Sequence, residues 1–161
     1  MPIGITAIFY GSPGTGKTEM AYQIAKATGR NVIPVDISKT KSKWFGESEQ
    51  IIKEVFDNYR LACSHGKPKP ILLFNEADGV MSKRMNLDRG TSCTQTLNAI
   101  QNIILEEMER FNGILIATTN LENNLDKAFE RRFLYKIRFE KPSETVKIKI
   151  WKSKMPNLTD D

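Results

Sequence analysis

The chain has 161 residues, of which 40% are hydrophobic and 27% charged, a length and composition typical of one soluble globular domain. Its apolar runs are too short to cross a membrane, and no charged-then-apolar leader opens the chain, so we expect a cytoplasmic protein with no membrane partner. Cys63, Cys93 and the single His65 have no spacing typical of a metal site or a disulfide framework, so we expect neither.

The net charge of +5 is compatible with an anionic ligand or with nucleic acid. Most of the basic residues are scattered along the chain. The exception is a group near the C-terminus, which we interpret as a solvated helix face: Lys147, Lys149, Lys152 and Lys154. Because the sequence has no basic stripe and no nucleic-acid motif, we do not expect nucleic acid as a partner.

Residues 5–10 form a short, largely apolar run that predicts a buried strand, and Met20, Ile24 and Ala27 recur at helical spacing. Between them, residues 11–18 read Gly-Ser-Pro-Gly-Thr-Gly-Lys-Thr and match the phosphate-loop pattern G-x-x-x-x-G-K-[ST]. The alternative is an ordinary glycine-rich turn, but the order of strand, loop and helix favours phosphate binding. The residues expected around the phosphates are Ser12, Pro13, Gly14, Thr15, Gly16, Lys17, Thr18 and Glu19.

The residue types of this loop suit an anion. Glycines let backbone N–H groups turn inward without hindrance from a Cβ, and the first N–H groups of the following helix carry partial positive charge. We expect Lys17 to reach the β- and γ-phosphates and the Thr18 hydroxyl to take one coordination site on Mg²⁺.

Apolar runs and helical patterns alternate along the rest of the chain. Further strands are predicted at 31–37, 71–74, 114–117 and 134–139. Further helices are predicted at 47–64, 94–110, 126–130 and 143–151, and polar loops at 38–46 and 82–92. This alternation implies a parallel α/β sheet, in which ligands bind at the carboxyl ends of the strands. The chemistry is therefore expected at Asn75, Glu76, Thr119 and Asn120.

Four segments, in this order, resemble the motifs of an AAA+ ATPase nucleotide-binding domain, and the resemblance covers nearly the whole chain. Residues 11–18 are similar to Walker A, 71–78 to Walker B, 117–120 to sensor 1, and 126–133 to the segment that holds the arginine finger. The resemblance implies a P-loop NTPase with a five-stranded parallel sheet between helices, the phosphate-loop strand placed centrally, and ATP with Mg²⁺ as ligands.

The resemblance also implies a division of the chain. Residues 1–142 would form the α/β subdomain, and residues 143–161 the start of a helical lid that is otherwise mostly absent. We therefore expect a fragment of a longer protein, which alone would bind nucleotide weakly and hydrolyse it poorly.

Hydrolysis needs a water that is oriented and deprotonated in line with the γ-phosphate. Glu76, one residue past its strand, is the expected general base. Asn120 is expected to hold that water or a γ-phosphate oxygen, and its alternative role is that of a turn residue. Asn75 departs from the family, which has Asp there, and offers Mg²⁺ a neutral carbonyl oxygen. We expect weaker Mg²⁺ dependence or slower turnover, and not necessarily loss of hydrolysis.

In ring-forming members of the family, an arginine of the fourth segment reaches the γ-phosphate of the neighbouring subunit. The resemblance implies this catalytic role for Arg132 first and Arg131 second, together with a homo-oligomeric ring. The alternative is a solvated pair of arginines at a helix C-terminus, where positive charge is favourable.

Trp44 and Phe45, followed by Gly46, resemble the pore loop with which AAA+ remodellers grip an extended polypeptide; the alternative is that both aromatics cover the second helix. We expect an ATPase that is coupled to the remodelling or unfolding of protein substrates. Two other functions stay open. One is a nucleic-acid motor or loader on the same core, supported only by the charge, and the other is a nucleotide-binding switch with little hydrolysis, motivated by Asn75.

Overall fold

A computed structural model describes residues 4–36, 48–65, 68–83, 92–120 and 125–155. The strands are β1 Ile5–Tyr10, β2 Val32–Asp36, β3 Ile71–Asn75, β4 Ile114–Thr119 and β5 Tyr135–Arg138. The helices are α1 Lys17–Ala27, α3 Ser48–His65, α4 Asp78–Met81, α5 Ser92–Glu109, α6 Lys127–Glu130 and α7 Glu144–Lys154. Trp44 and Phe45, the predicted pore loop, lie outside the described residues.

All four strand pairings are parallel, and the order in the sheet is β2-β3-β4-β1-β5. The predicted five-stranded parallel sheet between helices is therefore confirmed. The strand before the phosphate loop, β1, is an interior strand between β4 and β5, one position away from the middle strand, β4. The carboxyl ends of β1, β3 and β4 consequently meet at one edge of the sheet, which is where parallel sheets bind ligands.

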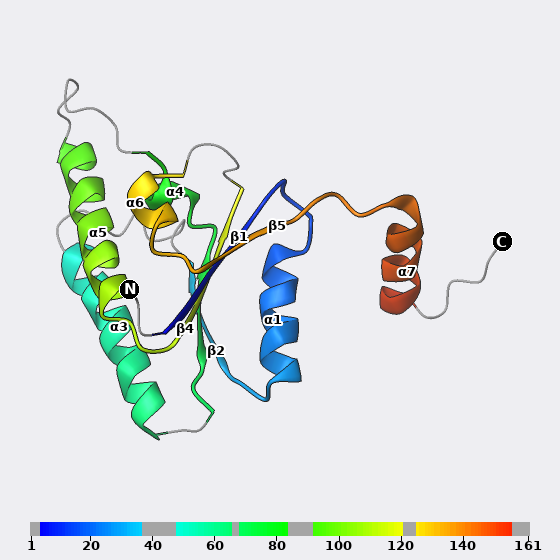
Figure 1. Ribbon diagram of the computed structural model, residues 1–161, viewed down its shortest axis with the longest axis horizontal. Helices are drawn as coiled ribbons and strands as arrows, with labels where there is room; N and C mark the ends of the chain where they lie inside the picture. The colour runs from blue at the N-terminus through cyan, green and yellow to red at the C-terminus, as the bar shows by residue number, and fades with distance from the viewer. Residues whose placement is uncertain (1–3, 37–47, 66–67, 84–91, 121–124, 156–161) are drawn as a thin grey trace.

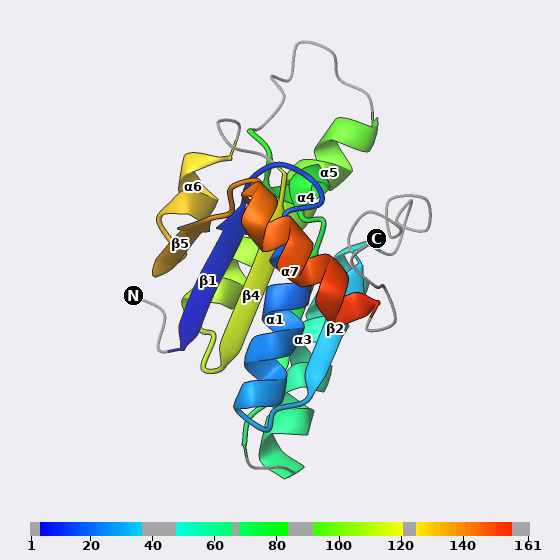
Figure 2. The ribbon, with the colours of Figure 1, turned by 90° about the vertical axis from the view of Figure 1, so that its right-hand side faces the viewer.

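Helices cover the two faces of the sheet unequally. Figure 1 shows α3 and α5 on one side of the strands and α1 on the other, and Figure 2 shows α7 in front of α1. Alternate residues of β3 face the two layers: Leu72 and Phe74 pack in the α3–α5 core, whereas Ile71 and Leu73 pack against α1. Continuous apolar strands are typical of a parallel sheet that is covered on both faces.

Small residues form much of the face of α1 that packs on the sheet. Ala21 and Ala25 are buried against the sheet, whereas Met20 is 45% exposed and Ala27 is exposed. Small alanine side chains let the helix axis approach the strands closely, and Met20 is turned to the outer side. The helix that the spacing predicts is present, and of its three residues Ile24 packs against the core.

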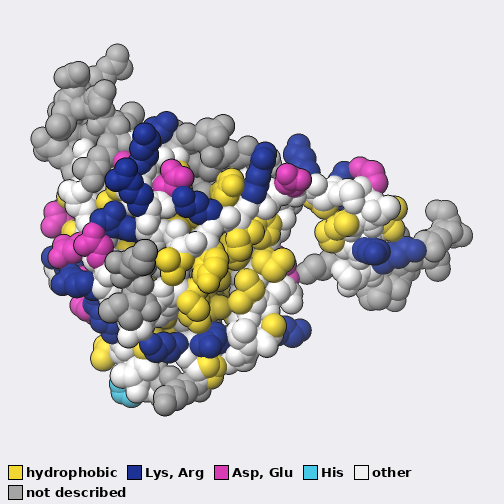
Figure 3. Space-filling view, viewed as in Figure 1, with side chains coloured by type: hydrophobic (Ala, Val, Ile, Leu, Met, Phe, Trp, Pro, Cys, Tyr) yellow, Lys and Arg dark blue, Asp and Glu magenta, His cyan; other side chains and the backbone are white. Residues whose placement is uncertain are grey.

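Two short elements also differ from expectation. The helix α4 was not predicted, because its four residues are too few to show helical periodicity. The last strand is shorter than expected and forms a sheet edge beside β1, where Tyr135 and Ile137 are exposed. Hydrophobic side chains gather in the middle of the face seen in Figure 3, over the region of β1, β5 and α1.

Candidate nucleotide-binding site

The loop between β1 and α1 has a backbone that only glycine adopts easily. Gly11, Gly14 and Gly16 have φ angles of 140°, 76° and 89°. At Gly11 a Cβ atom would also lie 2.2 Å from the carbonyl oxygen of Phe139, so no other residue fits there without a shift of the chain. The Phe139 N–H in turn donates to the Tyr10 carbonyl oxygen at 2.8 Å, which fixes the start of the loop against the end of β5.

Lys17, the first residue of α1, points back into this loop. Its side-chain Nζ donates to the carbonyl oxygens of Gly11 at 2.7 Å and Ser12 at 2.8 Å, and the residue is only 7% exposed. The Thr15 hydroxyl donates to the same Ser12 oxygen at 2.9 Å. The ammonium group is therefore held inside the loop by carbonyl oxygens, a fixed positive charge beside the N-terminus of a helix.

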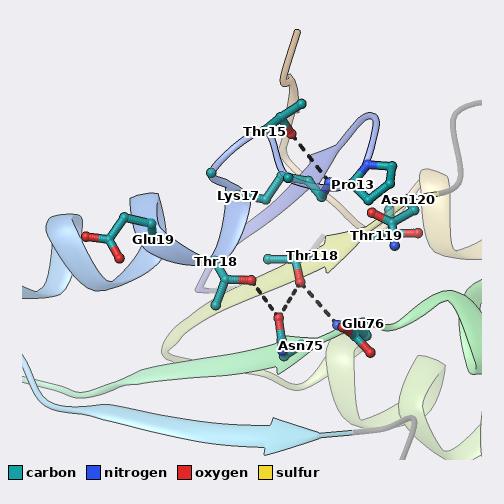
Figure 4. A pocket seen from close by; sticks show the side chains of 12 residues that line it. Pro13, Thr15, Lys17, Thr18, Glu19, Asn75, Glu76, Thr118, Thr119 and Asn120 are labelled. Carbon is teal, nitrogen blue, oxygen red and sulfur yellow. Dashed lines mark hydrogen bonds between the residues drawn. The ribbon is translucent and has the colours of Figure 1, made fainter. Parts of the chain in front are cut away.

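A hydroxyl of α1 and an amide of β3 meet across the site. The Thr18 hydroxyl donates to Asn75 Oδ1 at 2.8 Å, and the Thr118 hydroxyl of β4 donates to the same oxygen at 2.8 Å (Figure 4). Thr18 and Asn75 are the two residues that we expected at the metal. The donated proton leaves the lone pairs of the Thr18 oxygen available to a cation. Both lone pairs of Asn75 Oδ1 already accept hydroxyl protons, so this oxygen would reach Mg²⁺ through a water, or directly once one of the two bonds is given up.

Glu76 follows Asn75 in an unusual backbone conformation. Its φ of 52° is the only positive value of a residue other than glycine in the described part of the chain. Its N–H donates to the Thr118 hydroxyl oxygen at 3.1 Å, and the residue is exposed. The carboxyl group is therefore open to solvent, while its backbone is tied to β4.

Asp78 joins β4 to this turn and was not among the expected site residues. Its Oδ1 accepts bonds from the Thr119 hydroxyl and from the Asn120 N–H, the latter at 2.8 Å. Its Oδ2 accepts from the Asn120 side-chain amide at 3.2 Å. The carboxylate thus orients the Asn120 side chain. The signal in the sequence was its position three residues past Asn75, at the same edge of the sheet.

The phosphate loop and the polar residues at the ends of β3 and β4, apart from Asp78, border one cavity of about 260 Å³. Its lining comprises Pro13, Gly14, Thr15, Gly16, Lys17, Thr18, Glu19, Asn75, Glu76, Thr118, Thr119 and Asn120. Figure 4 shows the Glu19 side chain directed away from the others, and it accepts a bond from Gln23 at 2.8 Å. Ser12 does not line the cavity but contributes its carbonyl oxygen to Lys17.

The two arginines lie elsewhere in the fold, and neither lines this cavity. The Arg132 guanidinium forms an ion pair with Glu109 at the end of α5 and donates from Nη1 to the Ala128 carbonyl oxygen at 3.0 Å. Arg131 is exposed. Within one chain, therefore, neither arginine is brought to the residues that border the cavity.

A second cavity of about 410 Å³ adjoins the first on the side of α7. The two cavities share Pro13, Gly14 and Thr15, so they meet at the phosphate loop. The second one is lined further by Lys141, Pro142, Lys147, Ile150 and Trp151. It combines an aromatic ring and an aliphatic side chain with two ammonium groups, next to the anion-binding loop.

A buried strand, a glycine-rich loop with a buried lysine and the following helix define this chain as a P-loop nucleotide-binding domain. The model of the family named "ATPase family associated with various cellular activities (AAA)" matches residues 7–141. The chain therefore belongs to the AAA family of ATPases, and the predictions of the family and of its fold are confirmed.

Among curated relatives, the chain is 34% identical over 164 aligned residues to Protein SAV of Sulfolobus acidocaldarius, covering 98% of this chain and 20% of that protein. It is 32% identical to the 26S proteasome subunit RPT4 of Saccharomyces cerevisiae, covering 90% of this chain and 33% of the relative. The chain thus spans a minor part of the length of these relatives.

Among solved structures, the chain is similar to a chain in the structure of the E. coli MS115-1 HORMA:CdnC:Trip13 complex, with a TM-score of 0.73 and 22% sequence identity. The alignment covers 99% of this chain and 56% of that chain. This likeness shows the fold.

In the described residues, no helix combines the length and the apolar character needed to cross a membrane.

Proposed function

We propose that this chain binds ATP together with Mg²⁺ and hydrolyses it. The observation that carries the proposal is that one cavity joins the phosphate loop, the Thr18–Asn75 pair and the Glu76 carboxyl group. Backbone N–H groups of the loop and the start of α1 would hold the phosphates, with the Lys17 ammonium as the point charge beside them.

The Thr18 oxygen would hold Mg²⁺ directly, and Asn75 would hold it directly or through a bound water, since Mg²⁺ prefers oxygen ligands and keeps several waters when it also binds phosphates. The ion would neutralise charge on the β- and γ-phosphate oxygens. In the described residues no group of three or more His, Cys, Asp or Glu side chains could hold a metal, which agrees with a site that relies on the nucleotide for further ligands.

Glu76 is the proposed general base, because its carboxyl group is open to solvent at the rim of the cavity, next to the Mg²⁺ ligand Asn75. Asn120, oriented by Asp78, is proposed to hold the attacking water or a γ-phosphate oxygen through its amide. An amide group can do both, since it carries two N–H donors and a carbonyl acceptor.

The cavity between the loop and α7 is the proposed site of the nucleoside. The Trp151 ring and the Ile150 side chain offer a base an apolar surface, and the loop is shared with the phosphate cavity. This arrangement supports the predicted division into an α/β subdomain at 1–142 and the start of a lid at 143–161, which stays a prediction.

The test compares ATP hydrolysis by the wild-type chain and Glu76→Gln, with Glu54→Gln on the exposed side of α3 as a matched control. We expect Glu76→Gln to lose at least about 100-fold in kcat, as is usual for a general base, while fluorescent ATP still binds. Unchanged turnover in Glu76→Gln would contradict the proposed base. Binding without turnover in the wild type would instead favour the nucleotide-binding switch, with Asn75 as the cause.

We further propose that the complete protein forms a homo-oligomeric ring and remodels protein substrates. Arg131 is exposed, and neither arginine lines the nucleotide cavity of its own chain. Both facts support a role of these arginines in a neighbouring copy. The substrate role of Trp44 and Phe45 rests on the resemblance alone. The nucleic-acid motor keeps only the net charge of +5 in its favour. Sedimentation with and without ATP tests the formation of the ring. The cytoplasmic location stays a prediction, which cell fractionation tests.

A further inference from the structure

Thr118 binds three consecutive residues, namely the last residue of β3 and the first two residues of the turn that follows it. Its hydroxyl donates to Asn75 Oδ1 at 2.8 Å and accepts from the Glu76 N–H at 3.1 Å, and its backbone carbonyl oxygen accepts from the Ala77 N–H at 2.9 Å. The two hydroxyl bonds are visible in Figure 4. One residue of β4 therefore fixes the whole segment that carries the proposed base.

The turn needs such a fixed point because Glu76 has a left-handed backbone. A residue other than glycine at a φ of 52° has a strained backbone, which persists only where its surroundings hold it. The pairing of β3 with β4 ends at Phe74 and Ala117. Beyond that pair, the Thr118 hydroxyl supplies the acceptor for the Glu76 N–H.

The environment of Thr118 gives this hydroxyl one orientation. The residue is only 2% exposed, so solvent has little access to it. The hydroxyl donates its hydrogen to Asn75 Oδ1, which can only accept, and its oxygen accepts a hydrogen bond from the Glu76 N–H, which can only donate. A side chain without a hydroxyl would leave the Glu76 N–H without this acceptor, and the left-handed turn would lose the bond that fixes it.

We propose that Thr118 is a positioning residue: its hydroxyl holds Glu76 in the left-handed conformation and so directs the Glu76 carboxyl group into the nucleotide cavity. The inference rests on the proposed function, in which Glu76 is the general base. It assigns to Thr118, a strand residue in the lining of the cavity, a role in the rate of hydrolysis and not in the affinity for nucleotide.

The test compares Thr118→Val, which keeps the shape of the side chain but lacks the hydroxyl, with Thr118→Ser, which keeps the hydroxyl. Since a misplacement of a reacting group by about 1 Å can cost on the order of 100-fold in rate, we expect Thr118→Val to lose about 10- to 100-fold in kcat. KM and the affinity for fluorescent ADP should change less than about threefold, and Thr118→Ser should restore at least about half of kcat.

A double variant separates action through Glu76 from general damage. Glu76→Gln with Thr118→Val should hydrolyse ATP no more slowly than Glu76→Gln alone, because a residue that acts only through the base has no effect once the base is gone. Amide hydrogen exchange, followed by NMR, provides a readout without hydrolysis. The Glu76 amide should lose its protection in Thr118→Val and keep it in Thr118→Ser.

Several outcomes would overturn the inference. They are a kcat of Thr118→Val close to that of the wild type, equal damage in Thr118→Ser, a further slowing of Glu76→Gln by Thr118→Val, or unchanged protection of the Glu76 amide. Failure of the proposed function is recognised separately, by a wild type that does not hydrolyse ATP or a Glu76→Gln variant that hydrolyses it normally. In that case, the amide exchange of the Thr118 variants still decides whether Thr118 holds Glu76.

Discussion

The Asn75 side-chain oxygen accepts hydrogen bonds from Thr18 and Thr118, each at 2.8 Å, so a neutral amide lies between the helix that follows the phosphate loop and the strand that precedes Asn120. Two hydroxyl donors on one oxygen fix its orientation. The amide is therefore well placed structurally, but it contributes no negative charge to a bound cation.

Asn75→Asp is expected to increase the apparent affinity for Mg²⁺ on the order of tenfold, because it adds a negative charge beside the cation and keeps both acceptor contacts. The measurement is the Mg²⁺ concentration that gives half-maximal ATP hydrolysis or half-maximal nucleotide affinity. Asn58→Asp, at an exposed position of α3, serves as the control because it adds the same negative charge away from the site. An unchanged Mg²⁺ requirement in Asn75→Asp would contradict a metal role for Asn75.

Asp78→Asn should lower kcat by about tenfold, with a smaller effect on nucleotide affinity. The present carboxylate accepts from the Thr119 hydroxyl, from the Asn120 N–H and from the Asn120 amide, and an amide in its place offers only one acceptor oxygen. One of its new N–H groups would face the donor groups of Asn120. Steady-state kinetics test this, and an unchanged kcat would show that the orientation of Asn120 does not limit hydrolysis.

The sequence predicted the segments that border the site, but within segments 71–78 and 117–120 it did not single out Asp78 and Thr118, whose bonds depend on strand pairing. The phosphate loop, Asn75 and Glu76 were found because their spacing is local. The bonds of Asp78 and Thr118 join residues 41 to 43 positions apart, and they follow from the order in which β3 lies beside β4. No periodicity contains that information.

The same reason applies to the helices. The buried face of α1 is set by how close the sheet lies, which favoured Ala21 over Met20, and the partner of Arg132 is a glutamate at the end of α5, 23 positions away. Hydrophobic spacing predicts that a helix exists. It does not predict which of two adjacent apolar stripes faces the sheet when one of them is made of alanine.

Tyr59 joins α3 to the segment before β3 and to β4. Its ionisation should make the free energy of unfolding depend on pH in the alkaline range. Its hydroxyl donates to the Pro70 carbonyl oxygen and accepts from the Ile114 N–H, both at 2.9 Å. Burial raises the pKa of Tyr59 well above its ordinary value. Because the raised pKa favours the neutral form in the folded state, this contribution to stability is complete below about pH 10 and falls as pH rises further.

The measurement is the free energy of unfolding by urea at about pH 8 and about pH 10.5. Tyr59→Phe should cost about 1–3 kcal/mol at the lower pH, since the Ile114 N–H and the Pro70 carbonyl oxygen lose this partner. It should also show a smaller loss between the two pH values than the wild type. Tyr22→Phe, at an exposed position of α1, should behave as the wild type. An equal pH dependence of the free energy of unfolding in Tyr59→Phe and wild type would contradict the assignment of this dependence to Tyr59.

Arg132 is held by Glu109 and Ala128 within its own chain and does not line the cavity of Glu76, so a catalytic effect of this arginine requires a neighbouring copy. Arg132→Ala is expected to lose on the order of 100-fold or more in kcat at concentrations at which the protein assembles, as for other arginine fingers. Arg110→Ala, an exposed arginine at the end of α5, should leave kcat unchanged.

Mixing two inactive variants distinguishes action between subunits from action within one. In a head-to-tail ring of Arg132→Ala and Glu76→Gln subunits, roughly one interface in four joins an intact Glu76 to an intact Arg132. The equimolar mixture should therefore recover about a quarter of wild-type turnover, although neither variant is active alone. A mixture no faster than its components would contradict a role for Arg132 in the neighbouring site, and the same experiment with Arg131→Ala then decides between the two arginines.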